Sequence, residues 1–101
     1  MATTLKPLAR TALTTTTSTV LYTTPAATVT TITEIDVANT AATAATVTLS
    51  LNGVVLLPTI SIPANSVYSW SGKQVLNATN TITGGASATT VNIHISGVEV
   101  A

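Results

Sequence analysis

His94 is the first residue to test for chemistry, because imidazole is the commonest general base near neutral pH. Nucleophilic catalysis would also need a hydroxyl beside the ring and a carboxylate to orient it. Glu99 is near in sequence, but no motif marks it as that carboxylate. A zinc site would need more His or Cys than one His and no Cys. We therefore interpret His94 as an exposed or interface residue on a strand.

Glu34 and Asp36 are the second candidate, because residues two apart on a strand point to the same face. They could supply part of a calcium site, which takes six to eight oxygen ligands. No further carboxylate is nearby in the sequence. We interpret the pair as a solvated face, or as partners for Lys73 or Arg10 across an interface.

Tyr68 and Trp70 fall on one face of a predicted strand. Such a pair could form a stacking platform for a carbohydrate or a base. Aromatic pairs are more often part of a core or anchors at a subunit interface. We prefer a core or interface role for this pair and keep the stacking platform as the alternative.

The composition excludes several classes of function. The chain has 101 residues, of which 24 are Thr and 6 % are charged, and its net charge is zero. Three cations are too few for a nucleic-acid surface, and no residue set predicts a metal, a cofactor or a small-molecule ligand. A surface of Thr, Ser, Asn and Ala with no net charge favours association, so we expect a homo-oligomer. No apolar segment suits a signal peptide or a membrane span, so we expect synthesis in a cytoplasm and no membrane contact.

Short strands separated by turns dominate the predicted structure, since Thr, Val and Ile favour pleated sheets. Residues 46–51 and 90–96 alternate cleanly between aliphatic and polar side chains. Asn52-Gly53 is a strong hairpin signal, and Gly84-Gly85 is expected to be a turn or loop. Ile32 breaks the alternation of its strand, as a β-bulge would, and Gly97 could shift the register of the last strand. The turn spacing predicts an all-β protein, a single Ig-like or jelly-roll-type antiparallel sandwich. The further strands are expected at residues 19–24, 28–38, 54–57, 59–62, 66–70, 75–76 and 81–83.

The first 17 residues are predicted to form an extended N-terminal arm ahead of a sandwich domain over residues 18–101. Pro7 and the Thr14–Thr17 run disfavour a helix, and three leucines would be of no use to a free tail. We expect the arm to lay these leucines on a neighbouring subunit; a frayed terminus is the alternative. The candidate intersubunit contacts are Leu5, Leu8, Arg10, Leu13, Tyr68 and Trp70.

Several short segments of the sequence occur together in an order that is typical of one protein family. They are Lys6-Pro7-Leu8-Ala9-Arg10, Leu21-Tyr22-Thr23-Thr24-Pro25-Ala26, Ile35-Asp36-Val37-Ala38-Asn39-Thr40, Val47-Thr48-Leu49-Ser50-Leu51-Asn52-Gly53, Ile62-Pro63-Ala64-Asn65-Ser66 and the run from Val91 to Val100. Over nearly its whole length the chain resembles small virion structural proteins of tailed bacteriophages. The resemblance implies a sandwich that is part of a particle and has no active site.

The leading hypothesis is therefore a non-enzymatic virion protein, made in the bacterial host, that decorates or cements a capsid. Its partners would be copies of itself and other virion proteins such as the major capsid protein. A tail, neck or fibre component is one alternative. A host-glycan-binding adhesin that uses Tyr68 and Trp70 is another.

Overall fold

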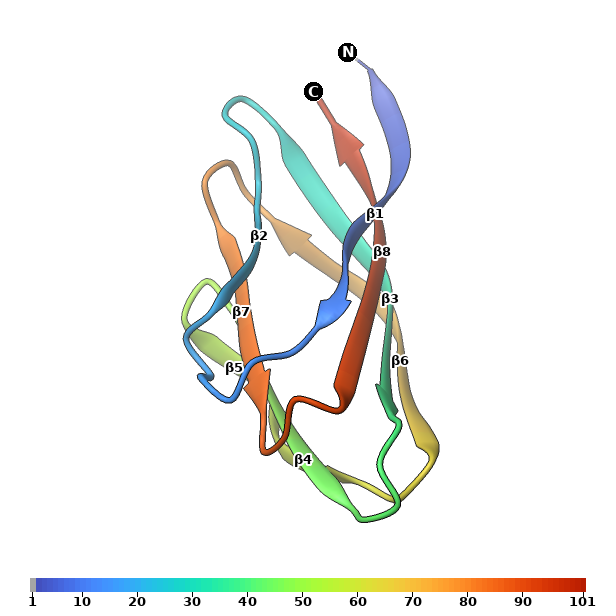
Figure 1. Ribbon diagram of the computed structural model, residues 1–101. Coiled ribbons are helices and arrows are strands. Elements are labelled where there is room, and N and C mark those ends of the chain that lie inside the picture. Colours follow the sequence, from blue (N-terminus) through green and yellow to red (C-terminus); the bar gives the residue numbers. More distant parts are fainter. Residues whose placement is uncertain (1) are drawn as a thin grey trace.

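The computed structural model describes residues 2–101 and leaves Met1 outside the described residues. Eight strands and no helix make up this part of the chain, so it holds no helix that could cross a membrane (Figure 1). The strands are β1 (Thr3–Ala12), β2 (Val20–Thr23), β3 (Val29–Asn39), β4 (Ala45–Leu51), β5 (Val54–Ile62), β6 (Ser66–Leu76), β7 (Thr81–Ala86) and β8 (Val91–Val100).

The strands form two four-stranded antiparallel sheets that pack together, which confirms the predicted β-sandwich. The first sheet, called sheet A below, has the order β1-β8-β3-β6, and the second, sheet B, has the order β2-β7-β4-β5. The chain leaves sheet A after β1, enters sheet B with β2, and both termini lie at the same end of the molecule (Figure 1).

Alternating aliphatic side chains fill the space between the sheets. Val47 and Leu49 of β4 and Ile93 of β8 are fully buried, while the intervening Thr48 and His94 point outward, as the alternation predicted. The Asn52-Gly53 turn is also confirmed: both residues have positive φ and they join β4 to β5. Pro58 lies within β5, at the edge of sheet B, where a strand tolerates the missing donor.

An irregularity crosses sheet A at the level of Ser96 and Gly97. β8 runs through without a break, but its two neighbours each carry one extra residue there, Leu8 in β1 and Thr33 in β3. β6 also has one extra residue relative to β3, because Gly72 and Lys73 lie opposite Thr33 alone. We call this line of insertions the register step. It confirms the bulge predicted beside Ile32. A register shift also occurs at the level of Gly97, as expected, but the extra residues are in the two strands that flank this glycine.

The structure does not show the extended arm predicted over residues 1–17. Residues Thr3–Ala12 are an edge strand of the sandwich and pair with β8, while Leu8 and Leu13 are buried in the chain's own core. Pro7 is compatible with this position because β1 is an edge strand. The sandwich therefore begins at β1, and the boundary drawn at residues 17 and 18 falls inside the connection between β1 and β2.

Gly84 and Gly85 form no turn or loop, contrary to the prediction; both lie within β7 and are buried. The connection from β1 to β2 crosses directly over them. Gly84 N donates to Thr19 O at 3.0 Å and Ala86 N to Thr14 O at 2.9 Å. A Cβ on Gly85 would lie 2.5 Å from Thr16 O, so only glycine lets the two backbones approach this closely.

Two other predicted divisions between strands were wrong. Residues 54–57 and 59–62 join into the single strand β5, with Thr59 in the left-handed region at φ 50°. Residues 75–76 are the end of β6 and do not form a separate strand. In each case backbone pairing continues through an irregularity that ends the simple alternation.

Gly85→Ala should destabilise the protein by about 1–3 kcal/mol, because the methyl group would push a main-chain oxygen away from β7. Urea unfolding followed by circular dichroism measures this change. Thr89→Ala, an exposed change in the turn before β8, is the control and should stay within about 0.5 kcal/mol of the wild type. Equal stability of Gly85→Ala and the wild type would contradict the proposed close packing of the connection on β7.

Candidate interaction surface

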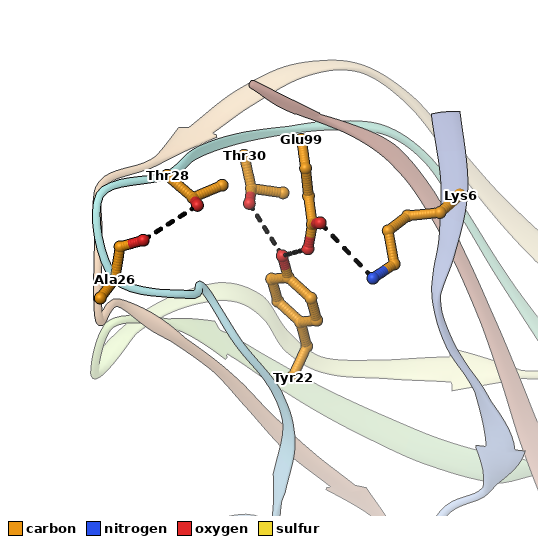
Figure 2. Close-up of polar contacts among 6 residues, drawn as sticks. All are labelled: Lys6, Tyr22, Ala26, Thr28, Thr30 and Glu99. Carbon is orange, nitrogen blue, oxygen red and sulfur yellow. Dashed lines mark hydrogen bonds and ion pairs between the residues drawn. The ribbon is translucent and has the colours of Figure 1, made fainter. Parts of the chain in front are cut away.

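A polar cluster lies between the sheets at the end that holds the termini. Glu99 faces the interior because it continues the inward series of β8 that begins at Val91. One carboxylate oxygen, Oε2, accepts a hydrogen bond from the Tyr22 hydroxyl, and the other, Oε1, lies 3.4 Å from Lys6 Nζ (Figure 2). Thr30 Oγ1 lies 2.8 Å from Tyr22 Oη. We call Lys6, Tyr22, Thr30 and Glu99 the terminal cluster.

The terminal cluster ties three strands of sheet A to β2 of sheet B. The Glu99 side chain is 14 % exposed, so its charge is largely removed from water and is compensated by an ammonium group and a phenol. Burial, and next the hydrogen bond to Glu99, raise the pKa of Tyr22. Next to the cluster, Ala2 and Ala101 exchange two backbone hydrogen bonds of 2.9 Å. These contacts join elements of the fold, and they occupy both oxygens of the carboxylate.

A row of charged residues crosses the outer face of sheet A on the far side of the register step. Arg10 pairs in register with His94, and His94 with Asp36, while Glu34 is next on the same face. This confirms that Glu34 and Asp36 share a face and that His94 points outward. Among residues 2–101 no group of three His, Cys, Asp or Glu side chains is placed to hold a metal ion.

The two carboxyl groups of this charged row share a hydrogen bond, and their pKa values move apart. The hydrogen bond with Asp36 raises the pKa of Glu34. That same bond, followed by one from Ser69, lowers the pKa of Asp36, and the nearby His94 adds a smaller lowering effect. Within this exposed pair, the Glu34 carboxyl therefore takes up a proton more readily than the Asp36 carboxyl.

Apolar side chains cover the same outer face on the terminal side of the register step. The extra residue in β3 turns Thr31 outward, and Thr31 pairs with Val98 of β8 on one side and Val75 of β6 on the other. Val98 in turn pairs with Leu5 of β1, so one row crosses all four strands. The next row pairs Val100 with Val29. We call Leu5, Val29, Val75, Val98 and Val100 the valine–leucine patch.

The patch is strongly exposed and continues into a pocket. Leu5 is 81 % exposed and Val75 60 %, whereas Val98 and Val100 are half-buried. Val75 also lines an open pocket of about 360 Å³ between the β4–β5 hairpin and the end of β6, together with the exposed Val54 and Val55. Neutral carboxamides of Asn52, Gln74 and Asn80 complete its rim. Large exposed apolar surfaces of this kind mark interaction sites in soluble proteins.

The predicted contact residues separate into three groups. Leu8 and Leu13 are buried in the core of their own chain. Tyr68 and Trp70 face inward from β6 and pack half-buried against that core, in register with Val37 and Ile35. Leu5 and Arg10 are exposed on sheet A, Leu5 in the valine–leucine patch and Arg10 in the charged row.

The sequence analysis missed four of the five patch residues, all of them valines. Val98 and Val100 alternate with Gly97 and Glu99, so a signal was present in β8. The outward direction of Val29 follows only if the chain carries an extra residue after Ile32, because the inward positions of β3 change there from even numbers (Ile32) to odd numbers (Ile35). The sequence predicted the bulge, but not that the bulge turns Val29 outward.

Tyr22→Phe should destabilise the protein by about 1–3 kcal/mol, because the largely buried Glu99 carboxylate would lose a hydrogen-bond donor. Tyr68→Phe is the matched control: this tyrosine is also half-buried and its hydroxyl makes no hydrogen bond among residues 2–101. Chemical denaturation of both variants measures the difference. Equal loss of stability in the two variants would show that the terminal cluster contributes nothing beyond ring packing.

Alkaline pH should weaken the wild type through Tyr22. Its pKa is raised above the ordinary 10.0, so the folded state holds the proton more tightly than the unfolded state. This contribution is complete below pH 10 and is lost as the pH rises through the folded-state pKa. The free energy of unfolding should therefore fall more steeply above about pH 10 in the wild type than in Tyr22→Phe. Parallel curves for the two proteins would contradict this role.

Two comparisons with known proteins found no match for this chain. No protein-family model matches the chain, and no curated protein sequence matches it. The assignment of function therefore depends on the surfaces described above and on the sequence pattern.

Proposed function

We propose that the chain is a non-enzymatic structural subunit of a protein assembly. The valine–leucine patch carries this proposal, since an apolar surface that crosses a whole sheet costs free energy while it stays in water. Contact with other protein would remove it from water without burying a charge, because none of its five residues is charged.

The charge distribution supports the same role. The protein has zero net charge, so little long-range repulsion opposes close packing of many subunits. The Lys6–Glu99 ion pair and the carboxylate–phenol contact are used inside the fold. Arg10 of the charged row lines an open pocket of about 320 Å³ between β1 and β2, but Glu34, Asp36 and His94 line none of the three best-formed pockets of residues 2–101, so these pockets do not gather the row around a substrate.

The assembly that we propose is a virion. The support is the sequence pattern that resembles small structural proteins of tailed bacteriophages, together with the β-sandwich that this resemblance implies. Within a particle the leading role is a capsid decoration or cement subunit in contact with the major capsid protein and with copies of itself. A tail, neck or fibre position is the alternative, and the location of the protein in the particle distinguishes the two.

The glycan-binding alternative gains no support from the aromatic residues. Tyr68 and Trp70 lie on the inner face of β6 and pack against the core, so their rings form no exposed stacking platform. We therefore favour packing against protein over binding of a sugar.

The chain should copurify with virus particles produced by the cells that make it, at a fixed ratio to the major capsid protein. Because the patch is neutral, the association should persist when salt is raised to about 1 M, where charge interactions are screened within about 3 Å. Density-gradient centrifugation followed by quantitative mass spectrometry measures both properties. Chain found only in the fractions free of particles would contradict the proposed function.

A further inference from the structure

We propose that β6 is a pairing edge, at which two copies of this chain join their sheets A through antiparallel β6 strands. β6 pairs with β3 on one side, and within residues 2–101 no strand lies on its other side (Figure 1). The inference goes beyond the proposed function, because it concerns the edge of the sheet and not the valine–leucine patch on its face, and because it needs no particle.

The main chain of β6 determines what kind of partner fits there. Alternate residues of an edge strand direct their N–H and C=O groups away from the sheet, where water is their partner until another strand arrives. Only an extended backbone offers acceptors and donors at the matching spacing over several residues. The partner of this edge is therefore a β-strand.

The other three edge strands carry features that oppose such pairing. β1 contains Pro7 and the extra residue Leu8, and β2 is only four residues long. β5 contains Pro58, followed by Thr59 in the left-handed region. In β6, by contrast, the segment Ser66–Ser71 has no proline, no charged residue and no register shift against β3. We call Ser66–Ser71 the open edge.

This difference between the edges determines which strand of a second copy can pair with β6. Because the three other edges of that copy are blocked, its own open edge is the one that remains. Two identical edges can pair in the antiparallel direction about a two-fold axis perpendicular to the sheet, and the spacing of their donors and acceptors is then the same by symmetry. The contact uses both open edges and closes at two copies.

The aromatic side chains favour a second copy over an unrelated strand. Tyr68 and Trp70 face inward from the open edge and are half-buried. When Ser69 lies opposite the partner's Ser69, each Tyr68 lies opposite the partner's Trp70. Directly opposite side chains of antiparallel strands are in contact, and aromatic pairs at such positions stabilise a sheet. An unrelated strand would need large apolar residues at the same two positions, whereas a second copy has them by its sequence.

Lys73 lies outside the paired segment and limits its length. Gly72 and Lys73 lie together opposite Thr33, so the regular edge ends at Ser71. In the register centred on Ser69, Lys73 comes opposite the partner's Asn65, in the turn before β6. The two lysines of the pair are then about 26 Å apart along the strands. They neither repel each other nor interrupt the pairing.

Sedimentation equilibrium of the purified chain tests the proposal. The open edge is shorter than a standard interface of about 20–30 residues a side, so we expect a Kd in the micromolar range. The wild type should change from its monomer mass of 10.2 kDa toward twice that mass as its concentration rises to about 100 µM.

An exchange of charge at two positions tests the strand and its register together. Val67 and Ser71 are exposed on the outer face of β6, and in the proposed register each Val67 lies opposite the partner's Ser71. Val67→Lys with Ser71→Lys places like charges opposite each other twice and should raise the Kd about tenfold or more. Val67→Glu with Ser71→Lys makes two pairs of opposite charge and should dimerise at least as tightly as the wild type.

Thr15→Lys with Thr89→Lys is the control for net charge. It adds the same two positive charges at exposed positions in the connections before β2 and β8, and it should dimerise like the wild type. Circular dichroism checks that every variant keeps the strand content of the wild type. The proposal is overturned if the wild type is monomeric at all concentrations, or if the two variants at residues 67 and 71 have the same Kd.

A measurement on the wild type alone covers the case in which a variant fails to fold. Trp70 is the only tryptophan of the chain, so its fluorescence reports on the open edge directly. Acrylamide should quench this fluorescence less as the concentration rises, because the partner's Tyr68 covers the half-buried indole. Quenching that is independent of concentration would overturn the proposal. A dimer that is absent from particles would contradict the virion role and leave the pairing of the open edges intact.

Discussion

One extra residue in β3, Thr33, determines which side chains of this central strand face the interior over its terminal half. Side chains alternate across a strand, so an insertion exchanges the two faces from that point on. Thr33 keeps Ile32 in the core and sends Thr30 inward and Thr31 outward. Thr30 of the terminal cluster and Val29 of the valine–leucine patch both take their direction from this exchange. Gly97, which has no side chain, leaves room for Leu8 where β1 makes the corresponding step.

The sequence allowed the fold class to be predicted because its strongest signals are local. Alternation over residues 46–51 and 90–96, the Asn52-Gly53 turn and the break at Ile32 each involve neighbouring residues. The errors concern contacts between distant segments. Gly84-Gly85 resembles a turn until the connection from β1 is seen to cross over it, and the first 17 residues resemble an arm until Leu8 and Leu13 are found in the core. The site was predicted least well, because the patch exists only when four strands are placed in register.

The few charges of the chain are distributed unequally between the two sheets. All six charged residues and the histidine lie on strands of sheet A, so sheet B and every connection are neutral. The outer face of sheet B is covered mainly by hydroxyl groups, for example Thr46, Thr48 and Ser50 on β4. Such a face can stay in water or approach neutral protein at little electrostatic cost. The molecule therefore has two chemically different sides, and the orientation of a subunit in an assembly would be fixed by them.

The pairing of Ala2 with Ala101 has a practical consequence for any fusion to this protein. A reporter or an affinity sequence attached at either end would emerge at the same point, beside the ends of β1 and β8, the strands that carry Leu5 and Val98. A bulky attachment there would crowd the apolar surface and would oppose the proposed packing for steric reasons alone. The connections at residues 40–44, 63–65 and 87–90 lie at the opposite end of the sandwich (Figure 1), which makes them the suitable places to insert a peptide for display.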